Sequence, residues 1–281
     1  MDKNKIIELL NKDLQDEHGA IIQYLNHAYG IGEGEMACEI EATARDEMRH
    51  LDWLAEAIVE LDGVLSLERG TMRMGGTQVS EWMQNNVILE EGAIKQYQEH
   101  ISLIDDPRIK RLLQRILSDE EAHHGSFSHF VEKAKRAGAK DIRGERQDKA
   151  AKTLNWGIEH EYTVILQYLL HSYMSKSEEA KEQLADQAIN EMQHLGWLAE
   201  ELASGGGKPN IEHTRVDRST RPVDMLRADI KIEKEVADAY DKAGKETDDA
   251  GLKKLLFRIR DNELYHIDVF NDLLEEAEGK K

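Results

Sequence analysis

The stretch RDEMRHLDWLAE, residues 45–56, returns almost unchanged as INEMQHLGWLAE, residues 189–200. Glu, Met, His, Leu and Trp keep their spacing in both copies, whereas the charged residues around them change. A glutamate and a histidine three positions apart lie on one face of an α-helix. The repeat therefore indicates two related helical domains, each with a carboxylate and an imidazole that point in one direction.

Helical periodicity extends over most of the chain. Apolar residues recur with the helical period, and only three prolines occur among 281 residues, a composition typical of helices. Turn-forming breaks divide the chain into helical segments; they fall at residues 30–35, 67–77, 104–108, 136–144, 175–177, 203–222 and 244–251. We predict an all-α protein of two tandem four-helix bundles, residues 1–140 and 145–281. Each is built from antiparallel helical hairpins with a long crossover between its second and third helices.

Charge and cysteine content narrow the classes of partner. The 56 acidic and 37 basic residues give a net charge of −19, which argues against binding to nucleic acid or to an anionic membrane surface. The single cysteine, Cys38, has no partner for an intramolecular disulfide, which favours a reducing compartment. No apolar run approaches the length of a membrane span, and the first residues are charged rather than signal-like. We therefore predict a cytoplasmic protein.

Four repeat units each combine a lone glutamate with a Glu-x-x-His motif. The lone glutamates are Glu17, Glu90, Glu161 and Glu233, and the motifs are Glu47 with His50, Glu120 with His123, Glu191 with His194 and Glu263 with His266. In every unit the lone glutamate precedes the paired one by 30 residues, and the midpoint falls in a predicted break. A hairpin folded there sets both glutamates level, roughly 22 Å from its turn at 1.5 Å per residue.

One hairpin offers two carboxylates and one imidazole, which leave a hard divalent ion under-coordinated. Two hairpins in one bundle bring four carboxylates and two imidazoles together, which is enough for two metal ions bridged by shared carboxylates. Without metal, four buried carboxylates would repel one another and partly protonate. We therefore predict that all twelve residues are metal ligands, six in each bundle.

This pattern resembles the ferritin-like di-iron carboxylate proteins. Within that superfamily, DEMRH at 46–50 and DEEAH at 119–123 are most similar to bacterioferritin, and the resemblance covers nearly the whole chain as two domains in tandem. It implies two di-iron sites and a ferroxidase activity, with Fe(II) and O2 or H2O2 as substrates. The ligand types alone also suit manganese or zinc. Bacterioferritin closes its shell with a fifth helix that has no counterpart here, so we expect no 24-subunit cage, and a smaller homo-oligomer stays open.

Two alternatives to the ferroxidase fit the same ligands. One is a peroxidase or catalase-like enzyme on a permanently bound di-iron or di-manganese centre. The other is a non-catalytic haem-binding or metal-binding module whose ions mainly stabilise the fold. Consumption of Fe(II), consumption of peroxide with the metal retained, and no turnover distinguish the three.

Several residues near the ligands have two interpretations. A tyrosine follows each lone glutamate by seven residues: Tyr24, Tyr97, Tyr168 and Tyr240. These tyrosines have either a catalytic redox role or a packing role in the core, with the hydroxyl bonded to a ligand. Met48 and Met192 occupy the position of bacterioferritin's haem-ligating methionine, but methionine also fills gaps in cores, and we expect no haem. Trp53 and Trp197 are assigned to packing. Near helix C-termini, the helix dipole explains His27, His100 and His171 without metal.

The two domains differ in the residue that precedes each paired glutamate. Domain 1 has Asp46 and Asp119, whereas domain 2 has Asn190 and Asn262. In the family this carboxylate typically orients a ligand histidine. The loss of two negative charges predicts that domain 2 binds iron more weakly and oxidises it later than domain 1.

Overall fold

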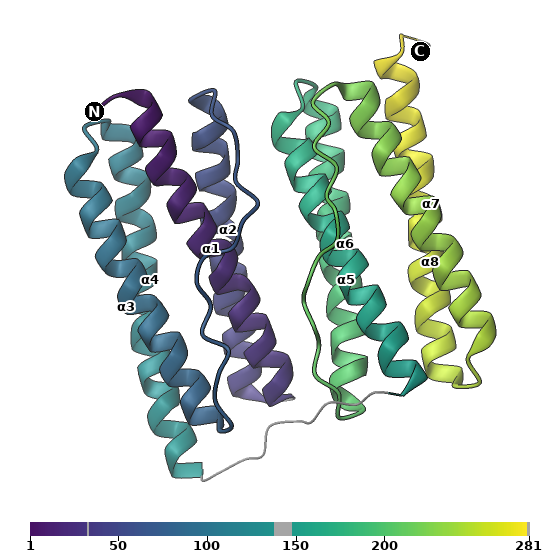
Figure 1. Cartoon of the computed structure of the whole chain (residues 1–281), viewed down its shortest axis with the longest axis horizontal. Helices are drawn as coiled ribbons and strands as arrows, with labels where there is room; N and C mark the ends of the chain where they lie inside the picture. The colour runs from purple at the N-terminus through teal and green to yellow at the C-terminus, as the bar shows by residue number, and fades with distance from the viewer. Residues whose placement is uncertain (33, 138–147, 280–281) are drawn as a thin grey trace. The chain divides into compact units, whose positions relative to one another are not determined.

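The computed structural model describes residues 1–32, 34–137 and 148–279, which form eight α-helices (Figure 1). The helices are α1 (Lys3–Ile31), α2 (Glu35–Glu60), α3 (Val79–Leu103), α4 (Pro107–Ala137), α5 (Lys149–Met174), α6 (Glu178–Ser204), α7 (Pro222–Glu246) and α8 (Ala250–Ala277). The predicted all-α class is confirmed.

The chain divides into two compact units, Met1–Gly144 and Glu145–Lys281, here named unit 1 and unit 2. Each is a four-helix bundle of two hairpins, α1–α2 with α3–α4 and α5–α6 with α7–α8. In both, the segment between the second and third helices runs back along the bundle, as predicted (Figure 1). The predicted domain boundary at residues 140–145 lies outside the described residues.

Local sequence signals account for the helix ends. Asp106 Oδ1 accepts hydrogen bonds from the backbone of Arg108 and Ile109, and Pro107 is the first residue of α4, as expected for an N-cap followed by proline. All four hairpin midpoints, residues 32, 105, 176 and 248, lie between helices. The spacing of 30 residues therefore places each glutamate pair level within its hairpin.

The crossover of unit 1 begins earlier than the predicted break at residue 67, because α2 ends at Glu60. Asp62 adopts a left-handed conformation with φ 51°, and the Gly63 N–H bonds to the Ile58 carbonyl. Aspartate is one of the few residues that tolerate this conformation, and the bond satisfies a carbonyl at the helix end. The Asp62-Gly63 pair was the overlooked stop signal.

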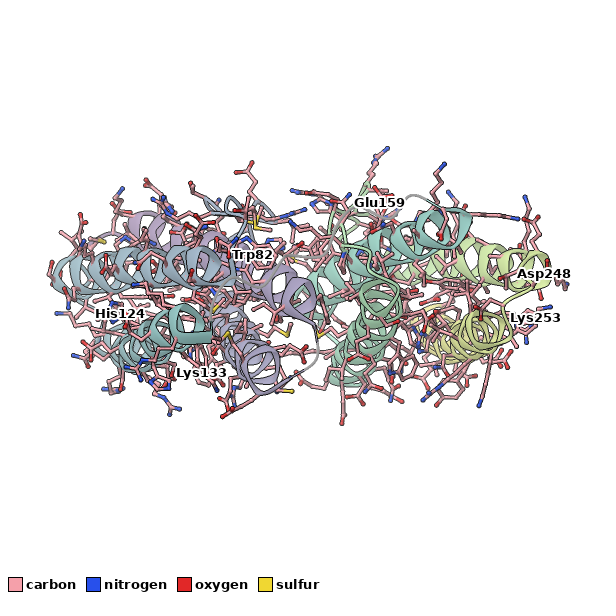
Figure 2. All side chains as sticks on the ribbon, turned by 90° about the horizontal axis from the view of Figure 1, so that it is seen from below. Trp82, His124, Lys133, Glu159, Asp248 and Lys253 are labelled. Atoms are coloured by element: carbon pink, nitrogen blue, oxygen red, sulfur yellow. The ribbon has the colours of Figure 1, made fainter. Side chains whose placement is uncertain are left out.

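Apolar side chains face inward along each bundle, and charged ones cover its outside. The largest buried side chains of unit 1 include Tyr24, Trp82 and Phe127, and those of unit 2 include Tyr168 and Phe270. Figure 2 shows charged side chains projecting from the helices, for example Lys133 on α4. None of the helices in the described part of the chain is long and apolar enough to cross a membrane. The ligand candidates are the main interruption of these cores.

Candidate metal centre

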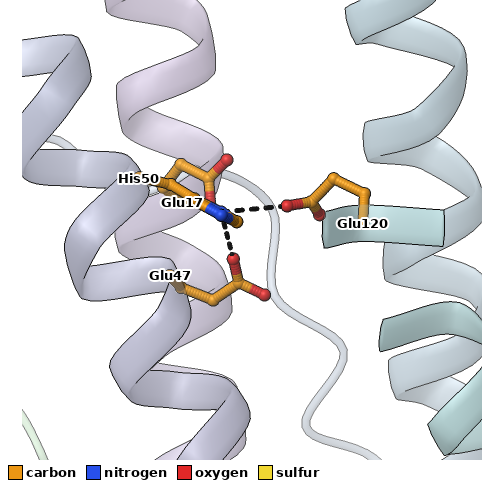
Figure 3. A group of neighbouring side chains, drawn as sticks. All are labelled: Glu17, Glu47, His50 and Glu120. Atoms are coloured by element: carbon orange, nitrogen blue, oxygen red, sulfur yellow. Dashed lines mark ion pairs between the residues drawn. The ribbon is translucent and has the colours of Figure 1, made fainter. Parts of the chain in front are cut away.

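In unit 1 the six predicted ligands meet in the middle of the bundle. All are buried, with less than a tenth of each residue exposed. Their oxygen and nitrogen atoms form two overlapping groups, each with all atoms within 4.8 Å of one another: Glu17, Glu47, His50 and Glu120, and Glu47, Glu90, Glu120 and His123. Glu47 and Glu120 belong to both groups. Figure 3 shows the first group, assembled from three helices.

The Nδ1 atom of each histidine faces the shared carboxylates. His50 Nδ1 lies 2.8 Å from Glu47 Oε2 and 3.0 Å from Glu120 Oε1 (Figure 3). His123 Nδ1 lies 3.0 Å from Glu47 Oε1. The two oxygens of Glu47 therefore point to the two histidines of opposite hairpins, which is the geometry of a carboxylate that bridges two ions.

Unit 2 repeats this arrangement with its own six residues. The two groups are Glu161, Glu191, His194 and Glu263, and Glu191, Glu233, Glu263 and His266. His194 Nδ1 lies 2.6 Å from Glu191 Oε2, and His266 Nδ1 lies 2.7 Å from Glu191 Oε1. Glu191 thus corresponds to Glu47, and Glu263 to Glu120.

Several of these buried atoms lie close to other ligand atoms but make no hydrogen bond of acceptable geometry, which is costly in a protein interior. In unit 1 they are both oxygens of Glu47, Glu120 Oε1 and the Nδ1 atoms of His50 and His123. In unit 2 they are Glu191 Oε1, both oxygens of Glu263 and the Nδ1 atom of His266. Carboxylate oxygens and imidazole nitrogens are the ligands that iron, manganese and zinc accept. Both sites therefore fit a pair of divalent cations.

The pKa values of these groups reflect the same crowding. Burial, and next the charge of Glu17, raises the pKa of Glu47 to about 7. In unit 2, burial and the charge of Glu191 raise the pKa of Glu161 to about 7. Burial alone would lower the pKa of His266, but the carboxylates of Glu191, Glu233 and Glu263 raise it to about 12. Without a cation, protons partly neutralise each site.

The four tyrosines each donate a hydrogen bond to a lone glutamate. The partner is the glutamate of the opposite hairpin: Tyr24 with Glu90, Tyr97 with Glu17, Tyr168 with Glu233 and Tyr240 with Glu161. Sequence spacing had placed each tyrosine only on the face of its own glutamate. Burial and the neighbouring carboxylates raise the pKa of the Tyr24, Tyr97 and Tyr240 phenols. The hydroxyls therefore stay protonated and orient the carboxylates.

The residues before the paired glutamates contact the outer nitrogen of the histidines. In unit 1, His50 Nε2 lies 3.4 Å from Asp119 Oδ2, and His123 Nε2 lies 3.5 Å from Asp46 Oδ2. Each aspartate therefore faces the histidine of the opposite hairpin. In unit 2, His194 Nε2 lies 2.9 Å from the Asn262 amide.

Asn190 breaks this symmetry. Its amide nitrogen donates to the Asp186 carbonyl and to Gln187 Oε1, both on its own helix α6. The two asparagines of unit 2 are therefore not equivalent, although the sequence had treated them alike.

The three histidines assigned to helix C-termini are buried in polar pairs, so the helix-dipole interpretation missed their partners. His100 Nδ1 lies 2.9 Å from Asp13 Oδ2, and His171 Nδ1 lies 2.9 Å from Asp229 Oδ1. His27 contacts the Asn86 side chain in the same way. Each partner stands four residues before a lone glutamate, a regularity that alignment of the repeats could have revealed.

Trp53 and Trp197 pack against ligand histidines, with ring centroids 5.8 Å from His50 and 5.5 Å from His194. Met48 and Met192 are half-buried on α2 and α6. The expectation that no haem binds at these methionines stays a prediction.

A cavity of about 230 Å³ reaches the site of unit 1 from between α1 and α3. Its inner wall includes the ligands Glu17, Glu90 and Glu120. Lys12 and Asp16 line its outer part. No sequence pattern predicts this opening, because it depends on how α1 and α3 pack.

Two segments of the chain, residues 7–137 and 151–279, match one protein family, Ferritin, described as a ferritin-like domain. A bacterioferritin from Desulfovibrio desulfuricans is 31% identical over 142 residues, which are 48% of this chain and 79% of that protein. Bacterioferritin BfrA from Mycobacterium tuberculosis is 31% identical over 125 residues, which are 42% of this chain and 78% of that protein.

Solved structures of bacterioferritins from the same two species are also similar to about half of the chain. The structure of M. tuberculosis BfrA matches with a TM-score of 0.45 and 28% identity, over 49% of this chain and 90% of the other. The D. desulfuricans structure matches with a TM-score of 0.45 and 30% identity, over 48% and 83%.

Proposed function

The chain belongs to the ferritin-like family, and from this premise we propose that each of its two domains binds two iron ions and oxidises Fe(II) with O2 or H2O2. The observation that carries the proposal is the pair of shared carboxylates in each bundle. Glu47 and Glu120 each take part in both ligand groups of unit 1, as do Glu191 and Glu263 in unit 2. Similarity to bacterioferritins favours iron over the other metals that this ligand set accepts.

The protein side chains bind and position the ions. Four carboxylates neutralise two divalent cations, and the histidines complete each ligand group from opposite ends of the site. The tyrosine hydroxyls hold the lone glutamates in place. Iron bound there supplies one-electron chemistry that protein side chains lack.

Fe(II) titration tests the proposal. Metal-free protein is titrated anaerobically with Fe(II) and then mixed with O2 or H2O2, while Fe(III) formation is followed by absorbance. We expect saturation at two Fe(II) per bundle, in line with the four ligand groups, and Fe(II) oxidation well above the protein-free rate. The control is the double variant Glu47→Ala, Glu191→Ala, which lacks a shared carboxylate in both sites.

The other outcomes identify the alternatives. Peroxide consumption with the metal retained and no net Fe(II) oxidation would support a peroxidase or catalase-like enzyme. Tight metal binding that raises the melting temperature without turnover would support a non-catalytic module. Metal analysis of protein purified without added iron identifies the resident ion.

A further inference from the structure

The two sites differ in how they are covered on the side of the lone glutamates. In unit 1, Lys12 and Asp16 at the outer part of the cavity form an ion pair with side chains 51% and 27% exposed. Gln96 donates a hydrogen bond to Asp16 and also lines the cavity. These side chains are long, polar and partly hydrated, so they can move aside without exposing apolar surface.

In unit 2, aromatic residues stand at the positions of this ion pair. Alignment of Glu17 with Glu161 places Trp156 at the position of Lys12 and His160 at that of Asp16. The Trp156 and His160 rings pack with centroids 4.1 Å apart. The edge of Trp156 also packs against Tyr240, with centroids 5.6 Å apart.

Tyr240 connects this aromatic cover to the metal ligands. Its hydroxyl donates to Glu161, and it corresponds to Tyr97, which lines the cavity of unit 1. α5 approaches closely here: a Cβ added to Gly157 would lie 2.9 Å from the Tyr240 hydroxyl. Movement of Trp156 would therefore expose both its own ring and that of Tyr240.

Two wall positions on α3 also differ between the units. Alignment of Glu90 with Glu233 places Val236 at the position of Ala93, and Ala239 at that of Gln96. Ala93 lines the cavity, whereas Val236 is only 2% exposed. A larger apolar group therefore stands at the position of Ala93, and the hydrogen-bonding side chain of Gln96 is replaced by alanine.

We propose that the two domains divide the work: unit 1 exchanges iron with solvent through its cavity and turns it over, whereas unit 2 retains its iron pair as a resident centre. The proposal deepens the proposed function and rests on it. Exchange in unit 2 has to wait for a local opening at Trp156 and Tyr240, so its rate is set by that opening rather than by the affinity of the ligands.

Iron release to a chelator measures this difference directly. Full-length protein is loaded anaerobically with Fe(II) and mixed with excess of a chromogenic Fe(II) chelator. We expect two phases of equal amplitude, the slow one about ten-fold or more slower because it requires local opening. Glu47→Ala should remove the fast phase and Glu191→Ala the slow phase.

Exchanging the covering residues between the units is the matched test. The variant Trp156→Lys, His160→Asp should convert the slow phase into a fast one, and Lys12→Trp, Asp16→His should do the reverse. Both keep an i, i+4 pair on a half-exposed helix face, and circular dichroism checks that the bundles are intact.

Two results would overturn the proposal: a single release phase in the wild-type protein, or two phases that neither exchange alters. Both are distinct from failure of the proposed function, in which the metal-free protein would bind no Fe(II) or would bind it without oxidising it.

Discussion

Units 1 and 2 carry the same ligands at the same spacing but surround them differently. Unit 1 places carboxylates behind its histidines and a polar ion pair over its cavity. Unit 2 places an amide behind His194 and an aromatic pair at the covering positions. The ligands determine where an ion can be bound, whereas the surroundings influence how tightly it is held and how fast it exchanges.

Affinity and exchange rate therefore need not change together. We expect loss of negative charge around the histidines of unit 2 to weaken iron binding at equilibrium, and the aromatic cover to slow release. A site can be weaker and yet retain its iron longer. The experiments below separate these contributions, from the largest expected effect to the smallest.

Removal of one shared carboxylate should eliminate one site and leave the other intact. Glu47→Ala and Glu191→Ala should each halve the iron bound, because each glutamate belongs to both ligand groups of its unit. We expect Glu47→Ala to slow Fe(II) oxidation far more, since the accessible site is in unit 1. Stopped-flow absorbance measures the rates. Equal rates in the two variants would show that the units are functionally equivalent despite their different surroundings.

The metal-free protein should lose stability as the pH rises from about 5 to 8. The pKa of Glu47 and that of Glu161 are raised to about 7, so the folded state binds protons that the unfolded state releases above its usual pKa of about 4.3. The pKa of His266 is raised to about 12, and its contribution is lost only as pH rises from its usual pKa through that value. All three effects have the same sign.

Thermal unfolding of metal-free and iron-loaded protein between pH 5 and 8 tests this. Iron binding requires deprotonated ligands, so the stabilisation by iron should grow over the same range. Glu47→Gln should reduce the pH dependence of unit 1 alone, and Glu161→Gln that of unit 2 alone. A melting temperature of the metal-free protein that rises from pH 5 to 8 would contradict the assignment.

The sequence predicted the helices and the meeting of the ligands because both follow from distances along the chain. A constant spacing of 30 residues about a turn determines the height of each glutamate in its hairpin. The same reasoning could not show that Tyr24 bonds Glu90 rather than a residue of its own hairpin. That contact depends on how the two hairpins pack against each other.

The sequence also could not predict which contacts are made by two identical residues at equivalent positions. Asn190 and Asn262 occupy the same place in their motifs. Asn262 nevertheless contacts His194, whereas Asn190 forms its hydrogen bond within α6. An amide side chain can form hydrogen bonds to the backbone of its own helix, so the sequence alone does not decide between these contacts. The cavity of unit 1 likewise depends on the conformations of the side chains that line it, such as Lys12 and Asp16.

Restoring the missing carboxylates should narrow the difference in affinity. Asn262→Asp should strengthen iron binding in unit 2 about ten-fold, the lower end for partners of ligand histidines. Asn190→Asp should have a smaller effect, because Asn190 bonds to its own helix. Fe(II) affinities measured in a Glu47→Ala background isolate unit 2. An equal gain from both substitutions would show that the added charge matters and its contact with histidine does not.

The converse variant, Asp119→Asn, serves as the control in unit 1. His50 Nε2 faces Asp119, so its affinity for iron should fall by a similar factor in a Glu191→Ala background. None of these three substitutions changes the residues that cover the sites. Unit 1 should therefore still release its iron faster than unit 2.

The smallest expected effect concerns the arginine over the tryptophan that is repeated in both units, Trp53 and Trp197. Arg258 lies 3.8 Å from the centre of the Trp197 ring, whereas Arg115 lies 5.6 Å from Trp53. Asp119 explains the difference, because Arg115 Nε bonds to its Oδ2 at 3.1 Å and is drawn away from the ring. Unit 2 has Asn262 at this position, which offers no charge to compete with the cation–π contact.

Double-mutant cycles on unfolding of the metal-free chain should give a coupling of about 0.5–1 kcal/mol for Arg258 with Trp197, the range for exposed cation–π pairs. The coupling of Arg115 with Trp53 should be smaller. Asp119→Asn should increase the coupling of Arg115 with Trp53. Asn262→Asp should decrease the coupling of Arg258 with Trp197. Couplings that are equal in the two units and unaffected by either substitution would show that the carboxylate does not control the position of the arginine.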